Sequence, residues 1–146
     1  MHLFHEATFL LVEDDDDHAY LMRRAFARHQ AAERLTRVSD GEEALSYLKG
    51  EGCHAGRTLP DIVLLDINLP KKNGLEVLRE LRGTPGLEQQ TVIIVSTSAT
   101  EEDRESAYKY GANSYLVKPV ESGLFQDLMD LLIDYWGKWN LPPQSS

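Results

Sequence analysis

The chain has 146 residues, a length that predicts a single domain large enough to bury a hydrophobic core. Its formal net charge is -9 and its pI is about 4.9, which disfavours nonspecific nucleic-acid binding because that activity needs a basic surface. Cys53 is the single cysteine, so no intrachain disulfide can form, and no apolar stretch approaches the ~18 residues of a membrane span. We therefore expect a cytoplasmic protein that binds neither nucleic acid nor membrane.

The first predicted unit is a strand over Phe9–Val12 that leads into a helix. Glu13 and the aspartates at positions 14–17 follow this strand, and acidic residues favour the N-terminus of a helix. Apolar residues then recur at helical spacing: Leu21, Met22, Ala25 and Phe26.

The second predicted unit is a short strand at Leu35–Val38 with a helix behind it. Asp40-Gly41-Glu42-Glu43 fits a capping box, in which the Asp40 side chain caps the helix and the Glu43 side chain reaches back to Asp40. A Gly-rich segment, residues 50–60, is expected to form a loop before the next strand.

The third and fourth units repeat this order. A strand is predicted at Ile62–Leu65, and the Asn73-Gly74 turn leads from it into a helix. The fourth strand is predicted over residues 92–95. Its helix is expected to begin near Glu101 and to end at Gly111, because glycine commonly follows the last turn of a helix.

The fifth strand is predicted over residues 115–117, and the last helix begins near Ser122. This helix has one broad apolar face, made of Phe125, Leu128, Leu132, Tyr135, Trp136 and Trp139.

The predicted strands differ in pattern from half-exposed ones. The first, third, fourth and fifth are nearly continuous apolar runs, which is typical of a parallel sheet covered on both faces. Strands that alternate with helices indicate a doubly wound α/β fold with right-handed crossovers. The sequence therefore predicts a five-stranded parallel sheet with helices on both faces.

Polar residues that could take part in catalysis or metal binding follow four of these strands. Glu13 and Asp14 follow the first, Asp66 the third, Ser96 the fourth and Lys118 the fifth. The carboxyl ends of parallel strands meet at one edge, so these side chains are expected to lie together. Three carboxylates at one edge would repel one another, and a divalent cation would relieve this. Oxygen ligands without His or Cys indicate Mg²⁺.

Asp66 is the candidate nucleophile at this edge. With Mg²⁺ on one side and the Lys118 ammonium on the other, its carboxylate is suited to attack phosphorus and form an aspartyl phosphate. Lys118 and the Ser96 hydroxyl would then stabilise the phosphoryl oxygens. Each signal has a plainer interpretation, such as a solvated helix N-terminus for the aspartate run, but their joint order favours the site.

These motifs resemble the receiver domain of the response regulators of two-component signalling, over residues 9–134. The resemblance implies a sheet order of 2-1-3-4-5. It makes Asp66 the phosphoacceptor and Lys118 the active-site lysine, while Ser96 and Tyr115 are the switch residues. It divides the chain into a receiver at 1–134 and a C-terminal extension at 135–146.

The resemblance also implies a metal site and an activity. Mg²⁺ would be held by Asp14, Asp66 and the backbone carbonyl of Asn68, with Glu13 acting through water. Asp66 would accept a phosphoryl group from a phosphohistidine on a sensor histidine kinase and lose it by slow self-catalysed hydrolysis, so the protein is not otherwise an enzyme. The Lys118–Pro119 bond is expected to be cis.

The chain is further similar to the small stand-alone regulators that partner bacterial phytochromes. The features that carry this are the insert at residues 50–60, the run Ser96-Thr97-Ser98 and the aromatic ending at residues 135–142. With no output domain expected, signalling would proceed by docking or onward phosphotransfer. Exposed aromatic residues are favoured at interfaces, so a homodimer is expected through three contacts: Tyr135, Trp136 and Trp139.

Two alternatives remain open at this stage. A phosphatase of the haloacid-dehalogenase type also uses a strand-end aspartate, but it expects a second acid two residues later, where Asn68 stands. A receiver-like module that binds proteins without being phosphorylated would have the same fold. Labelling of Asp66 by a phosphodonor distinguishes the second alternative from a working receiver.

Overall fold

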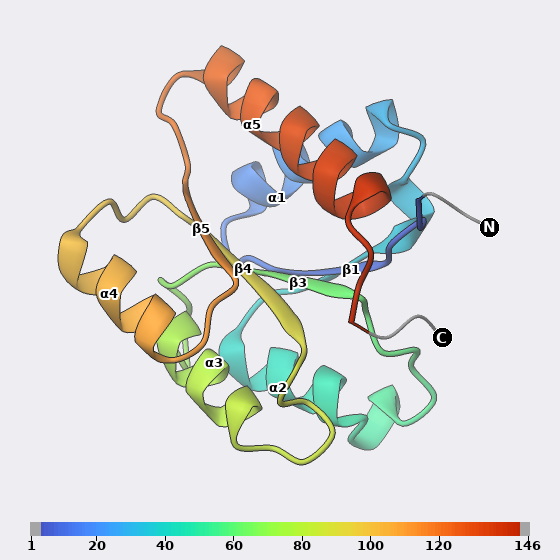
Figure 1. The fold of residues 1–146 in the computed structure, drawn as a ribbon, viewed down its shortest axis with the longest axis vertical. Helices are drawn as coiled ribbons and strands as arrows, with labels where there is room; N and C mark the ends of the chain where they lie inside the picture. Colours follow the sequence, from blue (N-terminus) through green and yellow to red (C-terminus); the bar gives the residue numbers. More distant parts are fainter. Residues whose placement is uncertain (1–3, 144–146) are drawn as a thin grey trace.

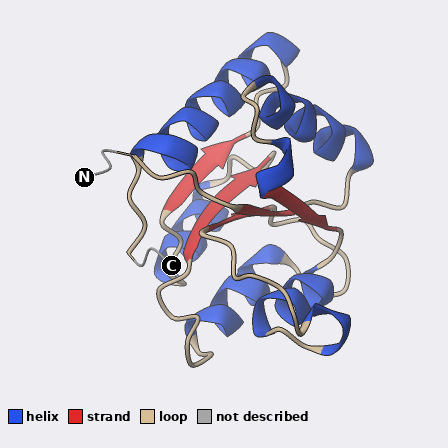
Figure 2. Ribbon diagram, turned by 90° about the vertical axis from the view of Figure 1, so that its right-hand side faces the viewer, coloured by secondary structure: helices blue, strands red, loops and turns tan. Residues whose placement is uncertain are grey.

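A computed structural model describes residues 4–143 and contains one parallel sheet with helices on both faces (Figures 1 and 2). The strand order is β2-β1-β3-β4-β5, which confirms the predicted order. The five strands are β1 at Phe9–Val12, β2 at Leu35–Val38, β3 at Ile62–Leu65, β4 at Thr91–Ser96 and β5 at Ser114–Val117.

Two layers of helices cover the sheet. Helices α1 and α5 lie on one face, and α2, α3 and α4 lie on the other (Figure 1). Their bounds are Asp16–Arg28 for α1, Gly41–Lys49 for α2, Gly74–Arg82 for α3, Glu101–Lys109 for α4 and Ser122–Asp134 for α5. Within residues 4–143, no helix combines the length and apolar character needed to cross a membrane.

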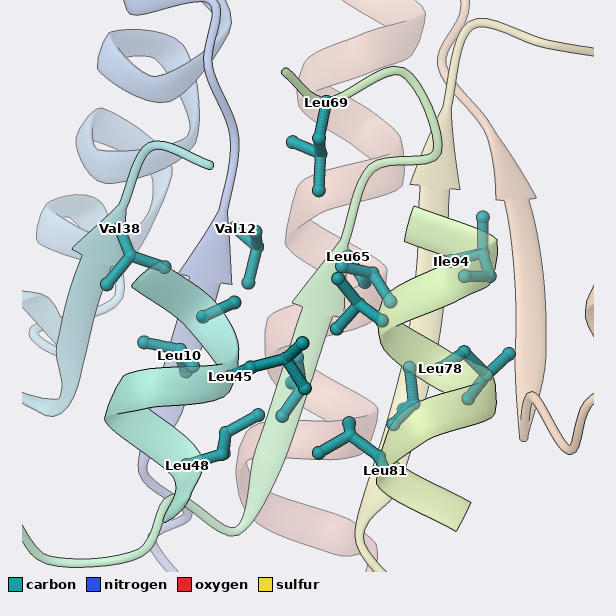
Figure 3. Packing of buried hydrophobic residues seen from close by; sticks show 14 of the residues in the cluster. Leu10, Val12, Val38, Leu45, Leu48, Leu65, Leu69, Leu78, Leu81 and Ile94 are labelled. Atoms are coloured by element: carbon teal, nitrogen blue, oxygen red, sulfur yellow. The ribbon is translucent and has the colours of Figure 1, made fainter. Parts of the chain in front are cut away.

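The apolar strands contribute side chains to two separate hydrophobic cores, one on each face of the sheet. Leu10 and Val12 of β1 point to the α2 and α3 side (Figure 3), whereas Phe9 and Leu11 point to the α1 and α5 side. Successive residues of a strand face opposite sides of a sheet, so a strand covered on both faces has to be apolar throughout. The continuous apolar runs of the strands therefore follow from the burial of both faces of the sheet. Truncating one of these leucines, such as Leu10, to alanine would cost about 2–5 kcal/mol.

The capping box forms on a different helix from the one predicted. Asp40 does cap α2, because its Oδ1 accepts from the Glu43 N–H at 2.8 Å. The Glu43 carboxylate, however, accepts from the Ser39 N–H at 3.0 Å and not from Asp40. The complete box is at α3, where Asn73 and Glu76 each accept from the other's backbone N–H. The sequence pattern predicted the cap at Asp40 correctly, but it predicted the wrong hydrogen-bond donor for the Glu43 carboxylate.

Two further expectations need correction. The Lys118–Pro119 bond is not cis, since no cis peptide bond occurs in the described chain. Because proline lowers the trans preference to about 0.5–1 kcal/mol, either isomer is accessible to such a bond and the sequence alone does not decide. Leu21, predicted on the apolar stripe of α1, is exposed, and the buried stripe consists of Ala19, Met22, Ala25 and Phe26.

The last helix continues past Asp134 as a π-helical turn over Tyr135–Trp139. The carbonyls of Gly137 and Lys138 accept hydrogen bonds from the N–H groups of Ala7 and His5, at 3.1 and 2.9 Å. A Cβ atom on Gly137 would lie 3.3 Å from the Phe9 ring, so only a small residue lets the turn approach β1 this closely. The two ends of the described chain are therefore tied together beside the sheet (Figure 1).

Candidate functional site

The acidic residues predicted for the site converge at the carboxyl ends of β1 and β3. Carboxylate oxygens of Glu13, Asp14 and Asp66 all lie within 4.8 Å of one another. Glu13 and Asp66 are only 1% and 7% exposed, whereas Asp14 faces solvent. Close carboxylates of which two are buried form a strongly negative site, and hard oxygen donors of this kind suit Mg²⁺.

Lys118 provides the positive charge that faces these carboxylates. It follows β5 and is 4% exposed. Its ammonium donates to Glu13 Oε1, to Asp66 Oδ2 at 3.2 Å and to His18 Nδ1 at 3.0 Å. An ammonium has three N–H donors, so each of them has an acceptor. The buried charge is thereby fully paired, as a charge removed from water has to be.

The environment of Glu13 changes its protonation. Burial raises the pKa of the Glu13 carboxyl to about 7, against the opposite influence of the hydrogen bond and charge of Lys118, while the Asp66 charge raises it further. Desolvation and a like charge both disfavour the ionised form. The site therefore takes up a proton near neutral pH unless a cation offsets the carboxylate charges.

The serine at the end of β4 is connected to Lys118 through the backbone. Ser96 is fully buried, and its carbonyl accepts from the Lys118 N–H at 2.8 Å. Its hydroxyl oxygen accepts from the Ser98 N–H at 3.2 Å. Pairing of β4 with β5 thus fixes the predicted hydroxyl and the predicted lysine relative to each other.

Tyr115 is tied to the same loop that follows β4. Its hydroxyl donates to the Ser98 carbonyl at 2.9 Å, and the Ser98 hydroxyl donates to Asp103 Oδ2 of α4. Burial raises the pKa of the Tyr115 phenol, although its bond to Ser98 acts in the opposite direction. Ser98 therefore contacts both predicted switch residues, Ser96 through its N–H and Tyr115 through its carbonyl.

The family assignment follows from this arrangement together with a comparison against family models. The model of the response regulator receiver domain matches residues 9–130. The chain belongs to the response regulator receiver family. Membership sets aside the phosphatase of the haloacid-dehalogenase type as an interpretation of the strand-end aspartate.

Relatives of this receiver include named regulatory proteins and phytochrome response regulators. The probable methanogenesis regulatory protein FilR2 of Methanothrix harundinacea is 41% identical over 138 residues, which cover 92% of this chain and 86% of that protein. The crystal structure of the phosphorylated cyanobacterial phytochrome response regulator RcpA has a TM-score of 0.90 at 33% identity and covers 96% of this chain and 100% of its own.

A third relative is the response regulator Rcp1 of Synechocystis sp., 35% identical over 109 residues that cover 75% of this receiver and 74% of that protein. Its Mn²⁺-bound crystal structure has a TM-score of 0.87 and covers 94% of this chain and 99% of its own. The fold and the family are therefore shared with phytochrome response regulators.

The predicted metal ligands are only partly brought together. Glu13, Asp14 and Asp66 form one group. The Asn68 N–H donates to Asp66 Oδ1 at 3.2 Å, which places Asn68 beside the carboxylate, while the part of its carbonyl in metal binding stays a prediction. The donor set is made of hard oxygens and fits Mg²⁺.

The three aromatic residues predicted for a dimer contact lie away from this site and differ in exposure. Tyr135 and Trp139 are 54% and 52% exposed. Trp136 is half-buried and packs on the core between the sheet and the layer of α1 and α5. Its contribution to the fold is thus established by the contacts it makes, and its contribution to a dimer stays a prediction.

His18 is the residue of this site that the sequence did not reveal. A lone histidine within an acidic helix start matches no recognised motif. The available signal was its position in the first turn of the helix after the acidic pair, because that turn stands directly over the carboxyl edge of the sheet.

Proposed function

We propose that this protein is a phosphorylation-dependent response regulator in which Asp66 accepts a phosphoryl group from a sensor histidine kinase of the phytochrome type. The observation that carries the proposal is the buried Lys118 ammonium, bound to both Glu13 and Asp66 beside the exposed Asp14. One ammonium against three carboxylates leaves an excess of negative charge. Such a site is suited to a divalent cation and to chemistry at a phosphoryl group.

Mg²⁺ would be held by Asp14, Asp66 and the Asn68 carbonyl, with Glu13 acting through water. Its contribution is to neutralise charge on the phosphoryl oxygens during transfer. The hard oxygen donors support this assignment, and the relative Rcp1 has been crystallised with Mn²⁺.

Three side chains of the protein have separate roles in the transfer: Asp66, Lys118 and Ser96. An Asp66 oxygen forms a bond to phosphorus while the bond from phosphorus to the imidazole nitrogen of the donor phosphohistidine breaks. The Lys118 ammonium, already beside Asp66, donates to a phosphoryl oxygen. The Ser96 hydroxyl, now an acceptor from Ser98, turns its hydrogen to another oxygen. Hydrolysis by water later returns Asp66 to its carboxylate, and the protein has no other catalytic activity.

Phosphorylation is transmitted through Ser98. A movement of the Ser96 hydroxyl toward the phosphoryl group breaks its contact with the Ser98 N–H, and the Ser98 carbonyl holds the Tyr115 hydroxyl. The loop and Tyr115 therefore form a two-state element that the charge on Asp66 biases. The altered surface comprises α4, β5 and α5.

The phytochrome-type kinase is supported by the likeness to RcpA, a phytochrome response regulator over nearly the same length. We place the protein in the cytoplasm, acting without nucleic acid or membrane. The alternative is a receiver-like module that binds a protein partner without phosphorylation.

Intact-protein mass after incubation with acetyl phosphate and Mg²⁺ tests the function. We expect a single phosphoryl adduct that requires Mg²⁺ and is missing in Asp66→Asn. Purified phytochrome kinase with ATP is the second donor. A wild-type protein that is folded by circular dichroism and takes a phosphoryl group from neither donor would be the binding module instead.

The proposed homodimer uses the C-terminal extension, residues 135–146, through Tyr135, Trp136 and Trp139. Because Trp136 also packs on the core, the test should leave it in place. We expect sedimentation of the double variant Tyr135→Ser, Trp139→Ser to show a monomer where the wild type is a dimer. Tyr20→Ser, an exposed tyrosine on α1, is the matched control and should stay dimeric. A wild-type monomer would refute the dimer.

A further inference from the structure

His18 completes the surroundings of the buried lysine from a separate element. It lies in the first turn of α1, and its Nδ1 is 3.0 Å from Lys118 Nζ. The backbone N–H of His18 donates to the Asp15 carboxylate at 3.0 Å, and the centroid of its ring lies 6.4 Å from that of the Phe125 ring of α5. The helix cap thus fixes the backbone of His18, and Phe125 lies beside its imidazole.

The contact determines which nitrogen of the imidazole is the acceptor. A lysine ammonium can only donate, so Nδ1 has to accept and the ring hydrogen is on Nε2. The other two acceptors of the ammonium are the carboxyl groups of Glu13 and Asp66. Because the ammonium is charged, its bond to Nδ1 is charge-assisted and its loss costs more than the loss of a neutral hydrogen bond.

We propose that His18 is a positioning residue for the phosphotransfer: its Nδ1 orients Lys118 toward Asp66 and keeps this orientation while the N–H now given to Asp66 turns to a phosphoryl oxygen. The inference rests on the proposed function, because it concerns the same lysine. Without His18, one N–H of a nearly buried ammonium lacks its acceptor, and Lys118 is no longer held at Asp66 from the α1 side.

The resting contact is tested without any phosphodonor. In ¹⁵N spectra of the wild-type protein, we expect the His18 Nδ1 signal of an unprotonated nitrogen and the Nε2 signal of a protonated one. We also expect a resolved Lys118 ammonium signal, which slow hydrogen exchange makes visible, and its loss in His18→Leu. A protonated Nδ1, or a Lys118 signal unchanged in His18→Leu, would overturn the proposal.

Kinetics of labelling by acetyl phosphate with Mg²⁺ test the positioning. His18→Asn places an amide oxygen close to the position of Nδ1 and keeps the acceptor, whereas His18→Leu removes it. We expect labelling about tenfold slower in His18→Leu, the lower end of the factor that corresponds to one hydrogen bond from a charged group, and near-normal rates in His18→Asn. Mg²⁺ affinity should be unchanged in both variants, because His18 is not among the metal ligands.

Equal losses in the two variants would overturn the proposal, as would a His18→Leu rate at or above the wild-type rate. If the wild-type protein takes no phosphoryl group at all, the proposed function fails. The ¹⁵N spectra then still decide whether His18 holds Lys118, so the two failures are distinguishable.

Discussion

Two aspartates flank β3 and serve different ends of the sheet. Asp61 precedes the strand, and its Oδ2 accepts from the Thr8 N–H at 2.9 Å and contacts His5 Nε2 at 3.0 Å. Asp66 follows the strand and shares one lysine with Glu13 while Asp14 stands close by. The first carboxylate has local partners that satisfy it, and the second belongs to a group with too few cations. Asp61 is only half-buried and Asp66 is buried, and the comparison indicates that the role of such a carboxylate depends on the balance of charge around it.

Exchanging carboxylates for amides at the two ends should give the largest contrast. Asp66→Asn is expected to abolish labelling by acetyl phosphate, because the amide lacks a nucleophilic oxygen anion. Asp61→Asn is expected to keep the wild-type rate, since it lies at the opposite end of β3. Intact-protein mass measures both. Labelling that survives in Asp66→Asn would place the phosphoacceptor elsewhere.

Removing the ammonium should be the largest change in stability. Lys118→Met leaves Glu13 and Asp66 buried without their cation, and breaking a buried pair in this way costs about 3 kcal/mol or more. We expect urea unfolding to show this loss, together with strongly reduced labelling. Lys49→Met breaks a more exposed ion pair with Glu80 and should cost less. Equal losses in the two variants would mean that the charges at the site are not specially dependent on Lys118.

The pH dependence should differ between wild type and a Glu13 variant. The pKa of Glu13 is raised from 4.5 to about 7, so its stabilising contribution in the metal-free protein is complete below 4.5 and is lost as the pH rises through about 7. Mg²⁺ binding has the opposite trend and should weaken as the pH falls below about 7, because the proton competes with the cation. Calorimetric Mg²⁺ titrations at several pH values measure this, and Glu13→Gln should flatten the profile in this range.

The smallest change in stability is expected at the end of β3 that lies opposite Asp66. His5→Ala removes one of the partners of Asp61 and should lower the free energy of unfolding by about 1 kcal/mol. Labelling of Asp66 should be unchanged. A large effect on labelling would mean that the two ends of β3 are coupled, and urea unfolding alongside labelling separates the two results.

The sequence was sufficient for the fold because the fold depends on patterns. Continuous apolar runs and their alternation with helices specify a parallel sheet covered on both faces, and the strand-end residues Glu13, Asp14, Asp66 and Lys118 meet where parallel strands end. These conclusions need only the order of residues along the chain.

Contacts between side chains of different helices and strands were harder to predict from the sequence. The second partner of the cap at Asp40 and the contact of His18 with Lys118 depend on distances across the fold. The half-buried position of Trp136 depends on the turn that α5 makes after Asp134. A sequence pattern gives the helix that carries a residue, and it leaves open which neighbour the side chain meets.

The hydrogen bonds from His5 and Ala7 to the turn after α5 have a consequence for rearranged chains. Because they hold residues near the two ends side by side, a short linker could join the ends without disturbing the sheet. New termini opened within residues 50–60 would interrupt no strand, since that segment contains only the short 3₁₀ turn Gly52–His54. A circularly permuted receiver of this kind would keep Asp66 and Lys118 in one sheet while moving both chain ends to the loop before β3.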